Sequence, residues 1–434
     1  SAPATPRPRA QPGGGCLART INENYVRGNL TATIVWNLIM ARYPQLRWDY
    51  TALVSATDPI GGHYDVMPAA WAAAHTTQFT QPGWHLLKHG SGSGWLAKGG
   101  TYVGYTGPRG EFTLVIEKLD ANESMCERGA RSSEQIAVTQ PEKATFVLKG
   151  ALSGTLFVWA SQFGGDEAGR TLFERQPDVT VGPRGTVTLT LLPNWVYTLS
   201  TELGGRGETT PPPPGVFPVA YADDFEGCPE AAMPALLAPM SGAFECTRGS
   251  DGRGGVVVRQ NAPALPICDR GDVTPYAIIG NGFRTTYNIS VDVLLPPGGA
   301  AFVGGRVKGP VGSNSGMDGV FLAANATHWW VALQVVTAAT TWSAPSPHVA
   351  EGRIPTSVPT DGWRQLSLSL EDTTASGSMS GVSLFDAVVV PPPHDHFTGT
   401  VAKLTIDLGT GGYGAIGTVG YIPVEFDSLA VESR

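Results

Sequence analysis

The stretch AHTTQFTQPGW, residues 74–84, gathers one histidine, three threonines, two glutamines and two aromatic residues. Hydroxyl and amide groups hydrogen-bond to the hydroxyls of a sugar, and an aromatic face stacks on a sugar ring. One interpretation is therefore a rim that faces a sugar. The other is a polar turn, because clusters of this composition are common in loops.

Hydrolysis of a glycosidic bond requires a pair of carboxylates, which lie about 5–5.5 Å apart in a retaining enzyme. Asp58, in SATDP, follows an apolar stretch, which suits the end of a barrel strand but also suits a turn before a proline. Glu23 falls in a helical pattern, where a solvated helix face is the simpler interpretation. Residues 1–80 offer no carboxylate pair, so the sequence assigns no catalytic residue.

Two acidic segments, YADDF (221–225) and VEFDSL (424–429), bracket the second half of the chain. The first and last strands of a β-sandwich commonly lie side by side, so we expect Asp224 and Asp427 to meet. Two carboxylates with backbone carbonyls form a calcium site, whereas two exposed acids at a sheet edge are the alternative. The five cysteines include no CxxC pair, which argues against zinc.

The chain has 434 residues, a net charge of −8 and 15% charged residues, with 55 glycines and 35 prolines. This composition favours two or three domains rich in β-structure. Nucleic-acid binding is not expected without a basic stripe, and no stretch reaches the roughly 18 apolar residues of a membrane span. Residues 1–15 lack the apolar centre of a signal peptide and predict a disordered lead. Because the sequence does not begin with Met, we expect either that a segment has been removed or that the sequence is a fragment.

Four Asn-x-Ser/Thr sequons begin at Asn29, Asn122, Asn288 and Asn325. A sequon marks an acceptor for glycosylation only in a protein that passes through the secretory route. Together with the scattered cysteines, the sequons favour an oxidising setting, either secretory or lysosomal.

Helical spacing of apolar residues, from Leu17 and Ile21 to Leu38 and Ile39, predicts a helix within residues 17–43 that Pro44 ends. YTALVSAT (50–57) predicts a strand, and DVMPAAWAAAHTTQ (65–78) predicts a helix with a proline in its first turn. The order helix, strand, helix is typical of an α/β barrel. A single strand is an incomplete parallel sheet, because parallel strands need neighbours.

From about residue 85 the pattern changes to β-structure. The segments 99–106 and 111–119 flank GPRG and predict a hairpin. Residues 186–191 alternate between threonine and Val187, Leu189 and Leu191, which is typical of a half-buried strand. After PPPPG (211–215), alternation over 289–295 and 366–370 predicts a second β block, 219–434, with a jelly-roll architecture.

With these stretches in view, the sequence resembles glycoside hydrolase family 59, whose members are lysosomal enzymes that cleave galactose from galactosylceramide. ATIVWNL, GGHYDVMPAAW, AHTTQFTQPGW, KGGTYV, ATFVLKG, YADDF, FVGGRV and FDSLAVESR occur in the order and at the spacing of the family. The resemblance implies a mainly β protein with a partial α/β unit: the end of a (β/α)8 TIM barrel (16–82), a β-sandwich (83–205), a proline-rich linker (206–218) and a lectin-like jelly-roll sandwich (219–434). It also implies that residues 74–84 are the exit from the last barrel helix.

The resemblance implies substrate contacts from Arg128, Trp36 and Trp48, with Trp48 in place of a tyrosine of the family. A guanidinium donates hydrogen bonds in a fixed fork, which suits the hydroxyls of galactose. A disulfide between Cys16 and Cys126 would hold Arg128 over the sugar.

Further implications concern metal and glycans. A structural calcium ion in the lectin-like domain would be held by Asp224, Glu226, Asp427 and the carbonyl of Val256, with Glu226 in place of an asparagine. Glycosylation is expected at Asn122, Asn288 and Asn325. Catalysis needs no cofactor.

The catalytic glutamates of the family both precede the position of Cys16, and the nucleophile position falls on Pro3. We therefore expect a chain that lacks the catalytic pair and the N-terminal half of the barrel, and that is inactive alone. Its expected partners are a galactolipid substrate and a saposin-type lipid-presenting protein, and its expected location is the lysosome or vacuole, or outside the cell. The alternative is a non-catalytic protein that binds glycans or glycolipids through its β domains.

Overall fold

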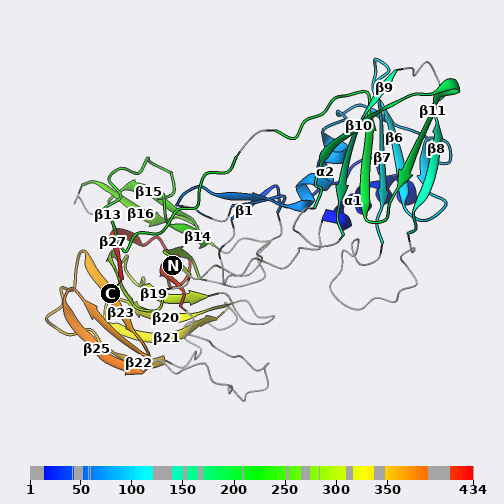
Figure 1. Ribbon diagram of the computed structural model, residues 1–434. Helices are drawn as coiled ribbons and strands as arrows, with labels where there is room; N and C mark the ends of the chain where they lie inside the picture. Colours follow the sequence, from blue (N-terminus) through cyan, green and yellow to red (C-terminus); the bar gives the residue numbers. More distant parts are fainter. Residues whose placement is uncertain are drawn as a thin grey trace. The chain divides into compact units, whose positions relative to one another are not determined.

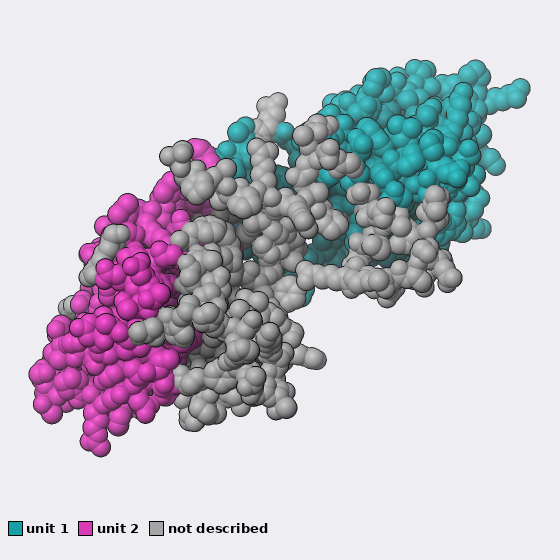
Figure 2. Space-filling view, turned by 60° about the horizontal axis from the view of Figure 1, so that its bottom comes forward, with its two compact units in different colours: residues 1–41, 50–57, 63–212 teal, residues 42–49, 58–62, 213–434 magenta. Residues whose placement is uncertain are grey.

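The computed structural model (Figure 1) describes residues 14–41, 43, 52–56, 58, 60–120, 139–149, 154–164, 170–207, 210–250, 254–264, 274–282, 284–308, 316–336, 348–389 and 411–433. The chain divides into two compact units (Figure 2). The first consists of residues 1–41, 50–57 and 63–212, and the second of residues 42–49, 58–62 and 213–434. Each unit has its own core, so each is described by itself.

Helix α1 (Gly14–Gly28) is shorter than predicted, and the expectation of helix as far as residue 43 is wrong. The Asn29 N–H donates to the Tyr25 carbonyl and the Leu30 N–H donates to the Asn24 carbonyl, while Asn29 takes a φ of 52°. The helix thus ends at a residue in the left-handed region, with backbone N–H groups that follow it bonded to carbonyls of the last turn. Ile34, counted toward the helical pattern, is 97% exposed in the extended segment that follows.

Three short strands follow α1: β1 (Ile39–Ala41), β2 (Val54–Ala56) and β3 (Tyr64–Val66). β1 and β2 are parallel, and β2 and β3 are antiparallel. The predicted strand in 50–57 is confirmed by β2. The predicted helix is confirmed as α2 (Pro68–Thr77) with Pro68 at its start, although residues 65–66 belong to β3. This three-stranded sheet does not show the (β/α)8 barrel that the resemblance implies.

The rest of the first unit is a β-sandwich. Its seven-stranded sheet has the order β10-β9-β12-β7-β6-β4, with β5 paired to β6, and a two-stranded sheet joins β8 and β11. The strands are β4 (His85–Leu86), β5 (Ser93–Trp95), β6 (Thr101–Thr106), β7 (Phe112–Lys118), β8 (Glu142–Val147), β9 (Thr155–Gln162), β10 (Glu174–Thr180), β11 (Thr186–Leu191) and β12 (Trp195–Ser200), with a 3₁₀ turn, η2 (Pro183–Gly185), before β11. The β6–β7 pair confirms the predicted hairpin.

Both faces of the seven-stranded sheet are covered, because strand residues alternate between them. In β7, Leu114 and Ile116 belong to a core shared with Val187 and Leu191 of β11. Val115, between them, belongs to a second core with residues of α1 and α2. The two helices therefore pack on the sheet of the sandwich, within one compact unit.

The second unit is a sandwich of two antiparallel sheets. One has the order β15-β16-β27-β18-β23-β24-β25 with β13 paired to β27, and the other has the order β14-β17-β26-β19-β20-β21-β22. The strands are β13 (Ala220–Asp223), β14 (Ala238–Ser241), β15 (Phe244–Arg248), β16 (Val256–Gln260), β17 (Tyr276–Ile279), β18 (Tyr287–Leu294), β19 (Ala301–Lys308), β20 (Gly316–Ala324), β21 (His328–Val336), β22 (His348–Arg353), β23 (Arg364–Glu371), β24 (Thr374–Met379), β25 (Val382–Val389), β26 (Tyr413–Thr418) and β27 (Glu425–Ser433).

The predicted alternation in the second unit is confirmed. Ile289, Val291 and Val293 of β18 and alternate leucines of β23 are buried in one core with residues of the facing sheet. The first and last strands, β13 and β27, pair side by side as expected. Neither helix that the structure describes is long and apolar enough to span a membrane.

Candidate functional site

Trp36 lies in the extended segment between the end of α1 and β1, and its side chain is 86% exposed. The backbone just after it is fixed, because the N–H groups of Leu53 and Val54 donate to the carbonyls of Asn37 and Leu38. The segment thus presents an indole to solvent from a hydrogen-bonded support. Such a side chain is free to stack on a sugar ring, which is the role that the resemblance implies.

The other residues implied for the sugar pocket, Arg128, Trp48 and Cys126, lie outside the described residues. Cys16 lies in the first turn of α1 and is disulfide-bonded, to a partner that also lies outside them. The start of α1 is closely packed, since a Cβ on Gly14 would lie 2.4 Å from Cε1 of Phe163. The Cys16–Cys126 pairing and the position of Arg128 stay predictions.

The stretch 74–84 forms the end of α2 and the turn that leads into β4. His75 is fully buried there, and its ring nitrogens each lie 2.8 Å from a hydroxyl, Nδ1 from Thr198 and Nε2 from Ser161. Burial lowers the pKa of His75 to about 3. His75 is therefore a neutral packing residue of the sandwich, while Gln78, Gln81 and Trp84 lie nearer the surface.

The residues predicted to hold calcium come from segments that meet along one edge of β27. Phe426 of β27 lies opposite Val258 of β16, and Leu429 lies opposite Asp223 of β13. Asp427 falls between these two pairings, where β16 begins and β13 ends. The sandwich topology therefore brings the predicted ligand segments together, although they are about two hundred residues apart in sequence.

The predicted carboxylates accept hydrogen bonds from backbone N–H groups. Glu226 Oε1 accepts from Val256 at 3.2 Å, and Asp224 Oδ1 accepts from Glu226 at 3.2 Å. Asp427 Oδ1 accepts from Ser428 at 2.7 Å. Glu226 thus links the end of β13 to the start of β16 through the N–H of Val256 rather than through its carbonyl.

Carboxylate and carbonyl oxygens are the ligands that Ca²⁺ prefers. Within the part of the chain that the structure describes, no group of three or more carboxylate, imidazole or thiol side chains is arranged to hold a metal ion. The donor chemistry fits calcium, but the carboxylates would have to turn from their backbone partners to converge on an ion. Calcium binding here stays a prediction.

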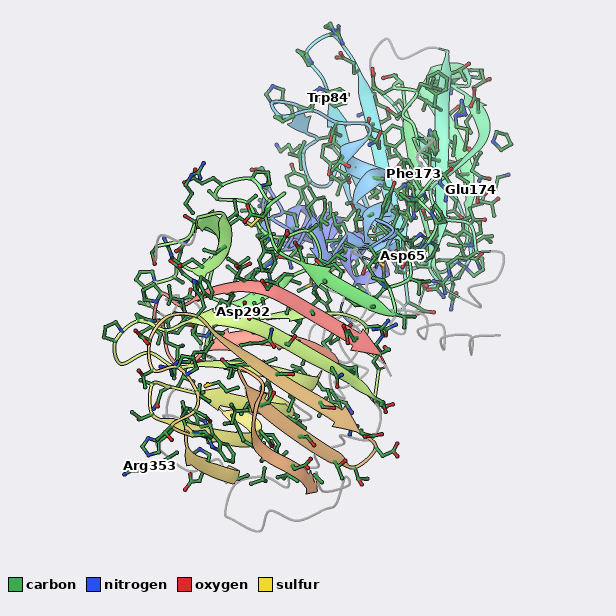
Figure 3. All side chains as sticks on the ribbon, turned by 90° about the vertical axis from the view of Figure 1, so that its left-hand side faces the viewer. Asp65, Trp84, Phe173, Glu174, Asp292 and Arg353 are labelled. Carbon is green, nitrogen blue, oxygen red and sulfur yellow. A yellow bond between two sulfur atoms is a disulfide. The ribbon has the colours of Figure 1, made fainter. Side chains whose placement is uncertain are left out.

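The sequence reasoning missed two further acids at this place. Asp223 closes the turn after β13, where its carboxylate accepts from the Phe225 N–H at 2.8 Å and the Tyr221 hydroxyl at 2.7 Å. Asp292 of β18, labelled in Figure 3, lies opposite Asp427 in the β18–β27 pair. The two adjacent aspartates in YADDF were a sequence signal for Asp223. No sequence signal pointed to Asp292, because its position opposite Asp427 depends on strand register.

The segment after Glu226 is tied to β15 by a disulfide between Cys228 and Cys246. Sequence alone does not decide the pairing among these two cysteines and Cys268. The loop closed by this disulfide spans 18 residues, which limits the conformations of the segment next to the predicted calcium ligands.

Of the expected glycosylation acceptors, Asn325 lies in the turn between β20 and β21. Its Oδ1 accepts from the N–H groups of Thr327 and His328, both at 2.8 Å. Asn288 is half-buried in β18, between β23 and β27. Asn122 lies outside the described residues, so glycosylation stays a prediction at all three.

The sequence is similar to known proteins along nearly all of its length. Residues 6–78 match glycosyl hydrolase family 59, residues 87–206 match the glycosyl hydrolase family 59 central domain, and residues 239–434 match the galactocerebrosidase C-terminal lectin domain. The galactocerebrosidases of Mus musculus and Homo sapiens are each 32% identical over 433 residues, and that of Salmo salar is 33% identical. Each alignment covers 97% of the chain, but the chain spans only 58% of the mouse and human proteins and 60% of the salmon protein.

Proposed function

Since the chain belongs to glycoside hydrolase family 59, we propose that it forms part of an enzyme that releases galactose from galactosylceramide. The observation that carries the proposal is the succession of three family matches, with 32% identity to a galactocerebrosidase over 97% of the chain. The substrate is thus a galactolipid. The setting that we propose is the lysosome or vacuole, or the outside of the cell, with a saposin-type protein that presents the lipid.

The proposed reaction is a double displacement with retention, in which one carboxylate attacks the sugar and a second acts as acid and then as base. We assign neither carboxylate to these 434 residues, and we expect them to be inactive alone. Their contribution is binding: the indole of Trp36 stacks on galactose, and Arg128 and Trp48 contact it from the same pocket. The exposure of Trp36 and its hydrogen-bonded support favour this role.

The lectin-like unit has a supporting role in this proposal. Ca²⁺ would be held by the carboxylates of Asp224, Glu226 and Asp427 with the carbonyl of Val256. The ion would join the end of β13 to the start of β16 and to β27, and so would stabilise the edge of the sandwich. It takes no part in bond cleavage.

A second candidate is a glycan- or glycolipid-binding protein without catalysis. The match of residues 239–434 to a lectin domain favours it, because that match covers most strands of one compact sandwich. The two candidates differ in whether galactose is released once the remaining part of a family enzyme is supplied.

The test is reconstitution. The chain is produced alone and together with the part of the mouse galactocerebrosidase that precedes the matched region, and galactose release from galactosylceramide vesicles is measured. We expect release only by the combination. If a soluble, folded combination binds galactosylceramide but releases no galactose, the binding function replaces the enzymatic one.

A further inference from the structure

A cavity of about 510 Å³ lies in the first compact unit, at a place that no proposed role of the chain uses. Three loops line it: the segment 78–84 after α2, the β6–β7 turn 107–111, and the segment that follows β12. The volume is in the range of small-molecule sites. The polar half of AHTTQFTQPGW therefore opens onto a cavity rather than onto bulk solvent alone.

Trp84, labelled in Figure 3, is an aromatic residue of the cavity lining. Its ring is half-buried and packs against the core shared by α1, α2 and the sheet. A Cβ on Gly107 would lie 2.7 Å from Cε2 of Trp84 and 2.5 Å from Oε2 of Glu111. The indole of Trp84 and the carboxylate of Glu111 thus both lie against Gly107. A larger residue at position 107 would displace one of these two side chains.

The carboxylate of Glu111 is held in place by Arg109. Glu111 Oε2 accepts from the Arg109 N–H at 2.8 Å, and Oε1 accepts from its guanidinium at 2.7 Å. Backbone N–H groups, its own and that of Arg109, and then the guanidinium hold the pKa of Glu111 below its ordinary value. The carboxylate therefore stays ionised and presents fixed acceptors to the cavity.

The charges of the lining disfavour anions, and its polar groups can hydrogen-bond to a neutral ligand. One guanidinium, from Arg109, faces the two carboxylates of Glu111 and Glu202, so the lining has a net negative charge. The amides of Gln78 and Gln81 add both donors and acceptors. Sugar hydroxyls donate to carboxylates and accept from amides and guanidinium, and the apolar face of the ring packs on an indole.

We propose that this cavity is a non-catalytic binding site for a neutral sugar, whose ring lies against Trp84 and whose hydroxyls bond Glu111 and the two glutamines. The proposal does not depend on the proposed hydrolase activity, since it concerns none of the residues assigned to that activity. It also accounts for the composition of residues 78–84, which a turn alone does not require.

The test uses the 434-residue chain with methyl β-galactopyranoside and methyl β-glucopyranoside as probes. Saturation-transfer NMR is expected to show saturation of the ring protons of at least one probe. Loss of an aromatic stacking partner weakens binding by about tenfold, so Trp84→Ala should raise the Kd by that factor. Trp95→Ala, which removes a 44% exposed tryptophan outside the cavity, should leave the Kd unchanged.

Trp84 also packs against the core, so a second variant is needed in case Trp84→Ala does not fold. Gln78 and Gln81 are exposed, and Gln78→Ala/Gln81→Ala should fold normally and raise the Kd about fivefold or more. The proposal is overturned if neither sugar is saturated by the folded chain. It is equally overturned if the double variant binds as the parent does, or if tetramethylammonium displaces the sugar, which would assign the carboxylates to a cation.

Discussion

Asp292 and Asp427 lie directly opposite each other in the β18–β27 pair of the second unit. Like charges at directly opposite positions of two strands destabilise a sheet. Gln365 donates to Asp292 Oδ1 at 3.3 Å, and Ser428 donates to Asp427 Oδ1 at 2.7 Å, so each carboxylate has a neutral partner. A cation beside Asp427 would offset the repulsion.

Calcium is therefore predicted to stabilise the second unit. Ca²⁺ at a hundred times its Kd adds about 2.7 kcal/mol to the free energy of unfolding, which raises Tm by several degrees. Glu226→Gln and Asp427→Asn should each remove most of this increase, because each removes a charged oxygen ligand. Scanning calorimetry with and without a chelator measures the effect.

The matched control is Glu432→Gln, which neutralises an exposed acid of the same strand that lies opposite Asn288. Its calcium response should equal that of the parent. An equal calcium response in the parent and in Asp427→Asn would exclude the site.

Acid should weaken the first unit through His75. Thr198 Oγ1 donates to the His75 carbonyl, so it accepts from Nδ1–H, and Nε2 then accepts from Ser161. Burial lowers the pKa of His75 to about 3, below the ordinary value of 6.5. Between pH 6.5 and pH 3 the His75 ring therefore binds a proton in the unfolded chain but not in the folded chain. The free energy of unfolding then falls by about 1.4 kcal/mol for each pH unit as pH falls from about 6.5 toward 3.

His75→Gln removes this proton, so its free energy of unfolding should fall less steeply with pH than that of the parent over the same range. Urea denaturation at pH 7.5, 6 and 5 gives the slope of the free energy of unfolding against pH for the parent and for His75→Gln. A difference in stability between the two proteins that is the same at every pH does not affect these slopes. His85→Gln, at an exposed position, should keep the parent slope. Parallel slopes for the parent and His75→Gln would contradict the buried neutral histidine.

The ion pair of Lys118 and Glu142 joins the two sheets of the first sandwich. Lys118 Nζ donates to Glu142 Oε1 at 3.0 Å and to the carbonyls of Gly99 and Lys98 at 2.9 and 3.2 Å, and its side chain has no exposed surface. Glu142→Ala leaves a buried ammonium without its counter-charge and should cost about 3–5 kcal/mol. The measurement is denaturant unfolding.

Two variants control for this loss. Lys118→Met/Glu142→Leu removes both charges and should be more stable than Glu142→Ala. Lys143→Ala, at the exposed neighbour, should change stability by less than about 0.5 kcal/mol. A Glu142→Ala variant as stable as Lys143→Ala would show that the pair does not hold the sheets.

Trp36 is predicted to act in binding without a role in folding. With 86% of its surface exposed, Trp36→Ala should leave Tm unchanged, while in the reconstituted enzyme kcat/KM for galactosylceramide falls about tenfold or more. Ile34→Ala, at a position 97% exposed in the same segment, is the control and should keep the parent activity. Equal kcat/KM values for the two variants would remove Trp36 from the site.

Much of the fold could be predicted from sequence, because period-two alternation is strong where a strand has one buried face. Ile289, Val291 and Val293 are of this kind. The predicted helix over 17–43 is confirmed as far as Gly28 and wrong beyond it, because Asn29 adopts a left-handed conformation that a count of apolar spacing does not detect. The pairing of the first and last strands, β13 and β27, could be predicted for a sandwich, but the position of Asp292 opposite Asp427 could not, since it depends on register.

The cavity around Trp84 shows a different limit. The composition of residues 74–84 fits either a sugar-facing rim or a polar turn, and Arg109, Glu111 and Glu202 come from loops far away in sequence. His75, in the same stretch, is a core residue. The composition drew attention to residues 74–84. Which of them are buried and which are exposed depends on how α2 packs on the sheet, which the composition does not contain.

The most direct measurement for the proposed function is to trap the covalent intermediate. The reconstituted enzyme is treated with a 2-deoxy-2-fluorogalactosyl fluoride, which leaves the sugar attached to the nucleophile of a retaining glycosidase, and the labelled peptide is identified by mass spectrometry. The account predicts a single label, on a carboxylate of the supplied N-terminal part, and none on residues 1–434. A label on any aspartate or glutamate of this chain would contradict the account.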